Sequence, residues 1–399
     1  MKTYLKPWFI FLLNVVVFAS CKKNNNDIPP DGSELFVSAT SSGNYTKAGL
    51  QTLATLGGYG SFTPYIMYDV DFYKLVYKTT YKGNLIEASG TLAIPKNTGM
   101  IPSVVSAQHG TIFKDTDAPS NFPATFSGFE ICAAAGFITA IPDYIGYGVS
   151  RNIVHPYYDQ QYSGTAVVDM LKAVRAYLSK QKIAYNNRLF LVGYSEGGYV
   201  TMAAQKEIET HPEHELVLIA AAEGAGGYDL PGMLSAISTT TAYGNPSYLA
   251  LILESYNTTY GWNRPYTDFY QTQYAAKIPG LLDGSKSGSE INSALNTSPT
   301  ALFNPTFFDN LKSATGEPVL KQALVTNSFG GWYPKSPTRM YHGTADVTVF
   351  YQTSVTTFNQ FKAAGATNVT FIPIPNGDHG TSIQPMMLDV LPWIQSLNK

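Results

Sequence analysis

Apolar runs separated by polar turns predict alternating strands and helices along most of the chain. Two alternating runs, 70–80 and 85–94, flank Lys82-Gly83-Asn84 and predict a β-hairpin. Short continuous apolar runs predict further, buried strands at 102–107, 137–141, 188–192, 216–222, 338–341 and 369–374. Apolar spacing predicts helices at 126–135, 165–179, 198–205, 355–361 and 386–397. This order predicts an antiparallel start followed by a mostly parallel central sheet, with helices on both faces.

The alternation is interrupted once, between about residues 226 and 335. No buried strand run occurs in this segment, which has the pattern of short helices and loops and is rich in tyrosine. An unstructured loop of that length is uncommon in a compact domain. The sequence therefore predicts a helical cap, inserted after the sixth predicted strand.

The first twenty residues have the pattern of an export signal. Lys2 and Lys6 precede an apolar run, and small residues at 19–20 precede Cys21. The run is shorter than the about 20 apolar residues of a membrane-spanning helix. The site resembles a bacterial lipobox, which predicts that Cys21 carries lipid and attaches an exported protein to a membrane of the cell envelope, in the periplasm or at the cell surface. Residues 21–33 are polar and rich in Asn and Pro, and they predict a flexible tether.

Composition indicates that residues 34–399 form one domain. Hydrophobic residues make up 44% of the chain and charged residues 14%, which is enough apolar material for a large core. The net charge of −2 gives no basic footprint for nucleic acid. If Cys21 is lipidated, Cys132 has no disulfide partner, and its apolar neighbourhood predicts a buried, inert thiol. No Cys/His cluster has zinc-ligand spacing, so no zinc site is expected. The oligomeric state stays open.

The pentapeptide Gly193-Tyr194-Ser195-Glu196-Gly197 lies between a predicted strand and a predicted helix. In that setting G-x-S-x-G forms a nucleophile elbow, whose sharp turn strains the serine backbone and lifts the hydroxyl out of the chain. The glycines suit places where strand and helix pass too closely for a Cβ atom. Ser195 is therefore the candidate nucleophile, and it needs a base that a third group orients.

His379 is the candidate base, because it alone among the six histidines follows the last predicted strand. Asp346 is the candidate acid, since it ends the segment after the preceding strand and gives the chain order Ser, Asp, His. Rival acids are Asp378, which is too close in sequence to turn back onto the neighbouring ring, and Glu223, at the end of the 216–222 strand. The other histidines have other expected places: His211 and His214 in solvent, His155 in a loop, and His109 and His342 at strand ends.

Attack on an ester carbonyl would place negative charge on its oxygen, and two backbone N–H groups should stabilise that charge. One is the N–H of Glu196, which follows the nucleophile. The other should come from the loop 108–111, where we favour the N–H of Thr111 over that of Gly110. His109 is expected to hold this loop in place by hydrogen bonds.

These motifs make the chain similar to the α/β-hydrolases, and within them to secreted lipases and esterases of the secretory lipase type. The matching segments are 108–111, 142–148, 193–198, 227–230, 342–346 and 378–379. The resemblance implies hydrolysis of a small-molecule carboxylic ester through an acyl-enzyme, with no metal or organic cofactor. The lipobox and Asn-rich tether resemble those of cell-envelope lipoproteins from Bacteroidota-type bacteria.

Two other functions remain open, a serine peptidase on the same scaffold and a non-catalytic binding lipoprotein. Prolyl-oligopeptidase-like enzymes carry a large propeller before the hydrolase domain. Only about forty residues separate the tether from the first predicted strand, and a propeller does not fit in that length, which argues against the peptidase. The presence of serine, histidine and aspartate together argues against the binding lipoprotein. The aromatic cap, without a long aliphatic stripe, favours short-chain or aromatic esters over long-chain triglycerides.

Overall fold

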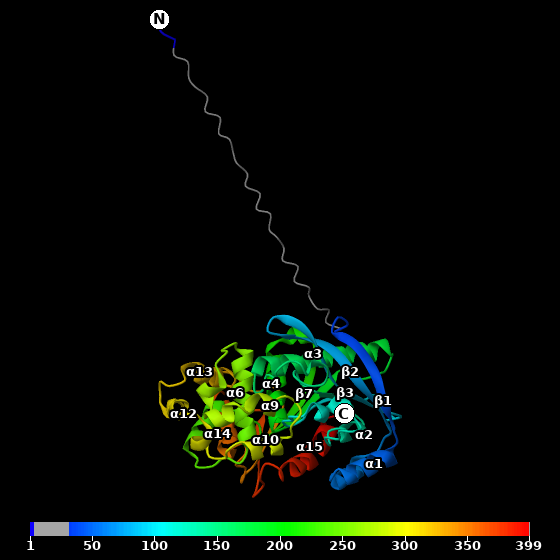
Figure 1. Ribbon diagram of the computed structural model, residues 1–399. Helices are drawn as coiled ribbons and strands as arrows, with labels where there is room; N and C mark the ends of the chain where they lie inside the picture. The colour runs from blue at the N-terminus through cyan, green and yellow to red at the C-terminus, as the bar shows by residue number, and fades with distance from the viewer. Residues whose placement is uncertain (4–31, 399) are drawn as a thin grey trace.

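A mixed sheet forms the centre of the protein (Figure 1). The computed structural model describes residues 1–3 and 32–398, and within them the sheet has nine strands in the order β1-β2-β3-β5-β4-β6-β7-β8-β9. The strands are β1 (Phe36–Tyr45), β2 (Val70–Tyr81), β3 (Asn84–Pro95), β4 (Val104–Gln108), β5 (Ile138–Pro142), β6 (Arg188–Tyr194), β7 (Val217–Gly224), β8 (Thr338–Gly343) and β9 (Val369–Ile374). The pairs joining β1, β2, β3 and β5 are antiparallel, and those from β5 across to β9 are parallel. The predicted mostly parallel sheet is confirmed.

Helices cover both faces of this sheet. Along β6, Leu189 and Leu191 join one buried cluster, whereas Phe190 and Val192 join the cluster on the opposite face, as the two-residue period of a strand requires. The first cluster includes side chains of α3 (Gln160–Lys180), α4 (Glu196–Thr210) and α14 (Tyr351–Ala363), and the second includes side chains of α1 (Lys47–Leu56), α2 (Ile131–Ala134) and α15 (Ile383–Leu397). Each fully buried side chain of this size contributes roughly 1.5–3 kcal/mol. Short 3₁₀ turns are η1 (Gly60–Tyr65), η2 (Asp115–Asp117), η3 (Pro119–Asn121), η4 (Gly148–Ser150) and η5 (Pro212–His214).

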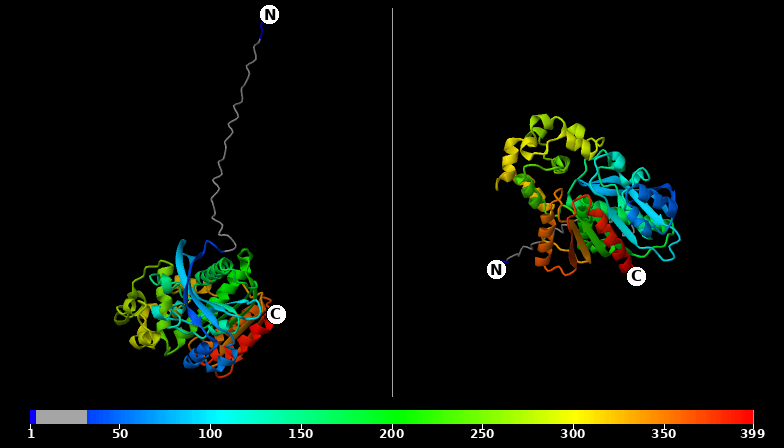
Figure 2. Two further views of the ribbon diagram at one scale, coloured as in Figure 1. Left: turned by 90° about the vertical axis from the view of Figure 1, so that its right-hand side faces the viewer. Right: turned by 90° about the horizontal axis from the view of Figure 1, so that it is seen from below.

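Residues 226–335, which we call the cap, connect β7 to β8. The cap helices are α5 (Leu230–Thr239), α6 (Pro246–Thr259), α7 (Tyr266–Phe269), α8 (Thr272–Ala275), α9 (Ile278–Leu281), α10 (Gly288–Ala294), α11 (Pro299–Leu302), α12 (Pro305–Lys312) and α13 (Pro318–Thr326). Aromatic contacts hold several of them together, such as the Phe269 and Phe307 rings, whose centroids lie 5.3 Å apart. Figure 2 shows the cap, coloured yellow-green to yellow, projecting beyond one side of the sheet.

Two elements differ from the sequence-based prediction. Strand β1 was not predicted, because it has no buried residue and pairs only with β2 at the edge of the sheet. It also makes the cap follow the seventh strand of the structure instead of the sixth. The helix predicted over 126–135 was too long, since α2 begins at Ile131. Gly128 has a φ of 90°, and the Glu130 carboxylate accepts a hydrogen bond from the Ser127 backbone N–H, so a turn precedes the helix.

The lipid-attachment prediction falls outside the described residues. Cys21, the apolar part of the export signal and nearly all of the tether lie in the 4–31 segment. Over residues 1–3 and 32–398, none of the helices combines the length and apolar character that crossing a bilayer requires. Cys132 is a buried free thiol in α2, as predicted, and burial raises its pKa to about 12, so it is inert.

Candidate active site

The Ser195 turn has the geometry of a nucleophile elbow. It joins the end of β6 to the start of α4, and Ser195 has a φ of 61° and a ψ of −126°, a combination that strains a residue with a side chain. The Ser195 backbone N–H donates to the Gly224 carbonyl at 2.8 Å, which ties the turn to β7. A Cβ atom on Gly193 would collide with the Gly197 carbonyl, and one on Gly197 with the Gln108 carbonyl. Both glycines are therefore required by the close approach of the backbone.

A continuous hydrogen-bonded chain joins the three predicted site residues. The Ser195 hydroxyl lies 2.8 Å from His379 Nε2, and His379 Nδ1 lies 2.6 Å from Asp346 Oδ2. Ser195 follows β6, Asp346 lies in the loop after β8 and His379 in the loop after β9, so three parallel strands of the sheet deliver the chain at their carboxyl ends. Ser195 and Asp346 are buried, and the His379 side chain retains 17% exposure. This arrangement can pass a proton from the hydroxyl to the imidazole.

Asp346 is held by more groups than sequence reasoning found. Its Oδ1 accepts from the backbone N–H groups of Thr348 and Val349, at 2.9 and 3.0 Å. Its Oδ2 lies 3.2 Å from His342 Nε2 as well as near His379. Burial alone would raise the pKa of Asp346, but hydrogen bonds from His342 and His379 outweigh burial and lower the pKa to about 2. Asp346 is therefore ionised wherever such a site could operate.

His342 was expected only at a strand end, and the structure makes it a support for Asp346. The His342 ring is fully buried, with Nδ1 2.6 Å from Ser354 Oγ and Nε2 2.8 Å from the Val349 carbonyl oxygen. These contacts fix the ring against the loop that carries Asp346. The four-residue spacing of His342 and Asp346 was the available sequence signal, but it carries no weight without the loop geometry.

The rival acids lie outside this hydrogen-bonded chain. The Asp378 carboxylate accepts from the backbone N–H and hydroxyl of Thr381, so it organises the loop beside His379. Glu223 is fully buried in β7, and neither of its carboxylate oxygens has a hydrogen-bond partner among residues 32–398. Burial raises the pKa of Glu223 well above its usual value, which favours the neutral form. Neither residue contacts the His379 ring in place of Asp346.

The loop 108–111 passes directly beside the elbow. A Cβ atom on Gly110 would lie 3.5 Å from the Ser195 Cβ. The Thr111 backbone N–H has no acceptor within the described part of the chain, and Glu196 is the first residue of α4, where an N–H has no intrahelical partner. The backbone N–H groups of Thr111 and Glu196, the two predicted oxyanion donors, therefore have no partner within their own loop or helix. Both belong to backbone beside Ser195.

His109 holds this loop, as the sequence suggested. Its Nδ1 donates to the Gly110 carbonyl at 2.7 Å, and its ring stacks on the Tyr144 ring with centroids 4.2 Å apart. The Tyr144 hydroxyl donates to the His109 carbonyl at 2.8 Å. Burial lowers the pKa of His109, which favours the neutral ring. The stacked rings of His109 and Tyr144 thus hold the loop beside Ser195 in place.

A buried pair that sequence reasoning missed anchors the first turn of α4. His155 Nε2 lies 2.6 Å from Glu196 Oε1, and both side chains are at most 6% exposed. His155 Nδ1 donates to the Ile145 carbonyl at 2.7 Å. The pair therefore fixes Glu196, whose N–H is a predicted oxyanion donor. A histidine in a loop carries no sequence signal of such a contact, because its partner lies 41 residues away.

A pocket opens beside Ser195 and extends into the cap, and its empty space, including the part open to solvent, is about 820 Å³. Its wall is mostly aliphatic, including Leu230, Met233, Leu234, Ile237, Leu249, Leu253, Leu320 and Leu324. These residues come from α5, α6 and α13. Because these aliphatic residues are spread over three helices, the sequence has no single aliphatic stripe that predicts the wall. The cavity can hold an extended apolar group next to the Ser195 hydroxyl.

Comparison with solved structures shows the α/β-hydrolase fold. A putative hydrolase from Legionella pneumophila is 23% identical, with 92% of this chain and 99% of that chain covered and a TM-score of 0.85. The rice cell wall degrading esterase LipA from Xanthomonas oryzae is 24% identical, with coverages of 91% and 96% and a TM-score of 0.76. For Candida antarctica lipase A in its closed state, the identity is 17%, the coverages are 92% and 82%, and the TM-score is 0.68.

Family membership rests on sequence. No curated protein matched the chain. The model of the secretory lipase family matches residues 131–397, well over half of the chain, and this region contains Ser195, Asp346 and His379. The protein therefore belongs to the secretory lipase family, and it is a carboxylic ester hydrolase.

Proposed function

We propose that the protein cleaves esters through an acyl-enzyme formed on Ser195. The observation that carries this proposal is the hydrogen-bonded chain from Ser195 through His379 to Asp346 at the mouth of an apolar cavity. The Ser195 oxygen attacks the ester carbonyl carbon while its proton moves to His379 Nε2. Ionised Asp346 holds the ring in the tautomer with its proton on Nδ1 and stabilises the imidazolium that forms.

The backbone N–H groups of Thr111 and Glu196 stabilise the oxyanion in this mechanism. When the tetrahedral intermediate collapses, the alcohol leaves with the proton from His379, and the acyl group stays on Ser195. Water then repeats the attack with His379 as base and releases the acid. Loss of one such N–H donor typically costs about 10²–10³ in kcat.

The cavity supports a substrate with an apolar acyl chain of medium or greater length. The sequence favoured short or aromatic esters, but the aliphatic wall formed by α5, α6 and α13 fits an extended alkyl group better. Each methylene that enters this wall contributes up to about 0.8 kcal/mol, or about fourfold in kcat/KM. The rate should rise with acyl length until the chain outgrows the cavity.

A series of p-nitrophenyl esters from acetate to palmitate, assayed beside aminoacyl anilides, tests two proposals: ester hydrolysis through Ser195 and the preference for a longer acyl chain. We expect ester hydrolysis with kcat/KM rising beyond butyrate, and a Ser195→Ala variant at least about 10⁴-fold slower. Val319→Ala, an exposed change on α13, is the matched control and should leave the series unchanged. Turnover of anilides without esters would make the protein a peptidase. Ester turnover that falls steadily beyond acetate would refute the acyl-chain proposal alone.

Export with a lipid anchor at Cys21 is a separate proposal. It is supported by the apolar run before Cys21 and by membership of a family of secreted enzymes. The anchor would hold the hydrolase at a membrane of the cell envelope. Metabolic labelling with a palmitate analogue should mark the wild-type chain and leave Cys21→Ser unlabelled. Equal labelling of both chains, or of neither, would contradict the proposal.

A further inference from the structure

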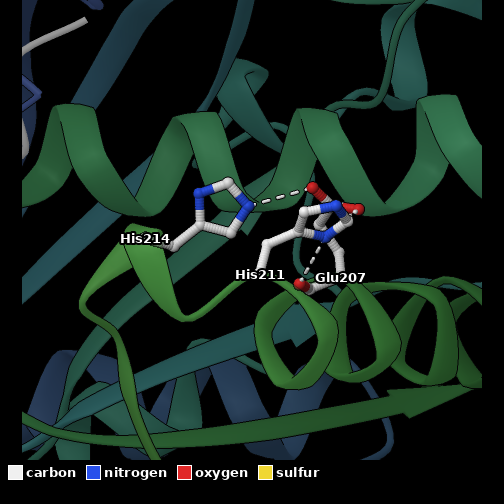
Figure 3. A group of neighbouring side chains, drawn as sticks. All are labelled: Glu207, His211 and His214. Atoms are coloured by element: carbon white, nitrogen blue, oxygen red, sulfur yellow. Dashed lines mark hydrogen bonds and ion pairs between the residues drawn. The ribbon is translucent and has the colours of Figure 1, made fainter. Parts of the chain in front are cut away.

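Three potential metal ligands meet at the end of α4 that is remote from Ser195. Glu207 lies in the last turn of α4, His211 follows the helix directly, and His214 ends the short turn η5. Figure 3 shows the three side chains gathered together. Sequence reasoning expected both histidines in solvent and considered only Cys and His as ligands. His214 is only 15% exposed at its side chain, and the third member of the group is a carboxylate.

The distances within this group suit one small cation. His214 Nε2 lies 2.9 Å from Glu207 Oε1, and His211 Nδ1 lies 3.4 Å from Glu207 Oε2. One ligand atom from each residue lies within 4.8 Å of the other two. Tetrahedral Zn²⁺ with bonds of 2.0–2.1 Å separates its ligand atoms by about 3.4 Å. Small rotations of these partly exposed side chains are enough to reach that separation.

The chemistry and the electric field also favour a cation. Two imidazoles and one carboxylate form a ligand set that zinc uses in proteins, with the remaining position open to water. The site lies at the C-terminus of α4, where the helix dipole attracts positive charge. We propose that Glu207, His211 and His214 form a Zn²⁺ site that ties the end of α4 to η5.

Two features limit the affinity of this site. His214 Nδ1 is buried and lacks a hydrogen-bond partner in the described residues, and outer-sphere partners of ligating histidines are commonly worth 10–100-fold in metal affinity. The Lys172 ammonium also acts on the Glu207 carboxylate and competes with a cation. Both features should weaken zinc binding at this site. Since α4 has 15 residues, the site is about 22 Å from Ser195 and should not affect ester hydrolysis.

Equilibrium dialysis of the EDTA-stripped full chain against ZnCl₂ tests the proposal. Wild type should bind one Zn²⁺ at this site, and His211→Ala and His214→Ala should each weaken that binding at least about tenfold. Glu213→Ala, an exposed change between the two histidines, should bind as wild type does. A hundredfold excess of zinc over the wild-type dissociation constant should raise the Tm of wild type by about 3–5 °C and that of His214→Ala by no more than about half as much.

Ester hydrolysis of each variant reports whether it has folded, because none of the three ligands belongs to the proposed active site. If His214→Ala does not fold, His214→Gln replaces it, since the amide keeps a polar contact with Glu207 but is a poor zinc ligand. Zinc binding that survives in the His211→Ala/His214→Ala double variant with unchanged affinity would overturn the proposal. So would the absence of any binding to wild type at millimolar zinc.

Discussion

Individual side chains around Asp346 explain why this carboxylate stays ionised in a buried place. Sequence reasoning located Ser195, Asp346 and His379, because each follows a predicted strand in the order that the elbow motif demands. It did not locate His342, His155 or Glu207 as members of polar clusters. Their partners are brought to them by loops whose shape no local pattern encodes, and Glu207 was not considered because it is an ordinary acidic residue on a helix.

The contact between His342 and Asp346 yields a prediction about catalysis. Replacing His342 by Ala removes one hydrogen bond to Asp346, so Asp346 becomes more mobile and its pKa rises. We expect kcat for p-nitrophenyl butyrate to fall about 10–100-fold with KM nearly unchanged, because His342 supports a group in the reaction and does not touch substrate. Steady-state kinetics from pH 4 to 9 measure both constants.

The comparison variants for His342 are Asp346→Asn and His342→Gln. Asp346→Asn should cost about 10⁴-fold, because it leaves His379 without its ionised partner. His342→Gln should recover part of the activity, since the amide can still donate a hydrogen bond. Equal kcat for wild type and His342→Ala would show that this histidine only fills space.

Strands and helices place these side chains, and the sequence predicted the buried elements best. Continuous apolar runs such as 188–192 and 216–222 have few alternative structures, so β6 and β7 appear within two residues of the predicted bounds. Strand β1 was not predicted, because an edge strand without buried residues needs no apolar pattern. The shortened α2 reflects Gly128, whose positive φ starts a turn where apolar spacing alone suggested a helix.

The buried carboxyl group of β7 should make stability depend on pH. Burial raises the pKa of Glu223 well above its ordinary value of 4.5, so the unfolded chain loses this proton at lower pH than the folded chain does. The stability that neutral Glu223 contributes is therefore fully present below about pH 4.5 and is lost as the pH rises. Glu223→Gln cannot ionise and should gain about 2–4 °C in Tm at pH 8, with a smaller gain at pH 4.5.

Thermal unfolding followed by circular dichroism at both pH values measures this difference. Glu87→Gln, on the exposed end of β3, is the matched control and should change Tm little at either pH. A Glu223→Gln variant that is less stable than wild type at pH 8 would mean that ionised Glu223 is accommodated in the fold.

In the whole molecule, the carboxyl ends of the parallel strands carry the candidate site residues, and the cap shapes the space for substrate. The sequence predicted where the cap lies but not the cavity inside it, because the wall is assembled from α5, α6 and α13 only after these helices pack. Tyrosine, the most conspicuous residue type of the cap, contributes mainly to buried contacts such as those of Tyr256 and Tyr270.

Filling the cavity should change the choice of ester without changing the chemistry. Leu320→Trp places a large ring in the wall, so kcat/KM for p-nitrophenyl laurate should fall at least about tenfold while that for acetate stays within about twofold. Val319→Trp, on the exposed side of the same helix, is the matched control and should keep both rates. Parallel losses for laurate and acetate in Leu320→Trp would show that the acyl group binds elsewhere.

Covalent labelling with a fluorophosphonate, followed by mass spectrometry of the intact chain and its peptides, tests the identity of the nucleophile. One adduct per chain should form, and it should map to Ser195. Ser195→Ala should take up no label, and His379→Ala should react far more slowly. An adduct on another residue, or ester hydrolysis that persists at the wild-type rate in Ser195→Ala, would contradict the mechanism.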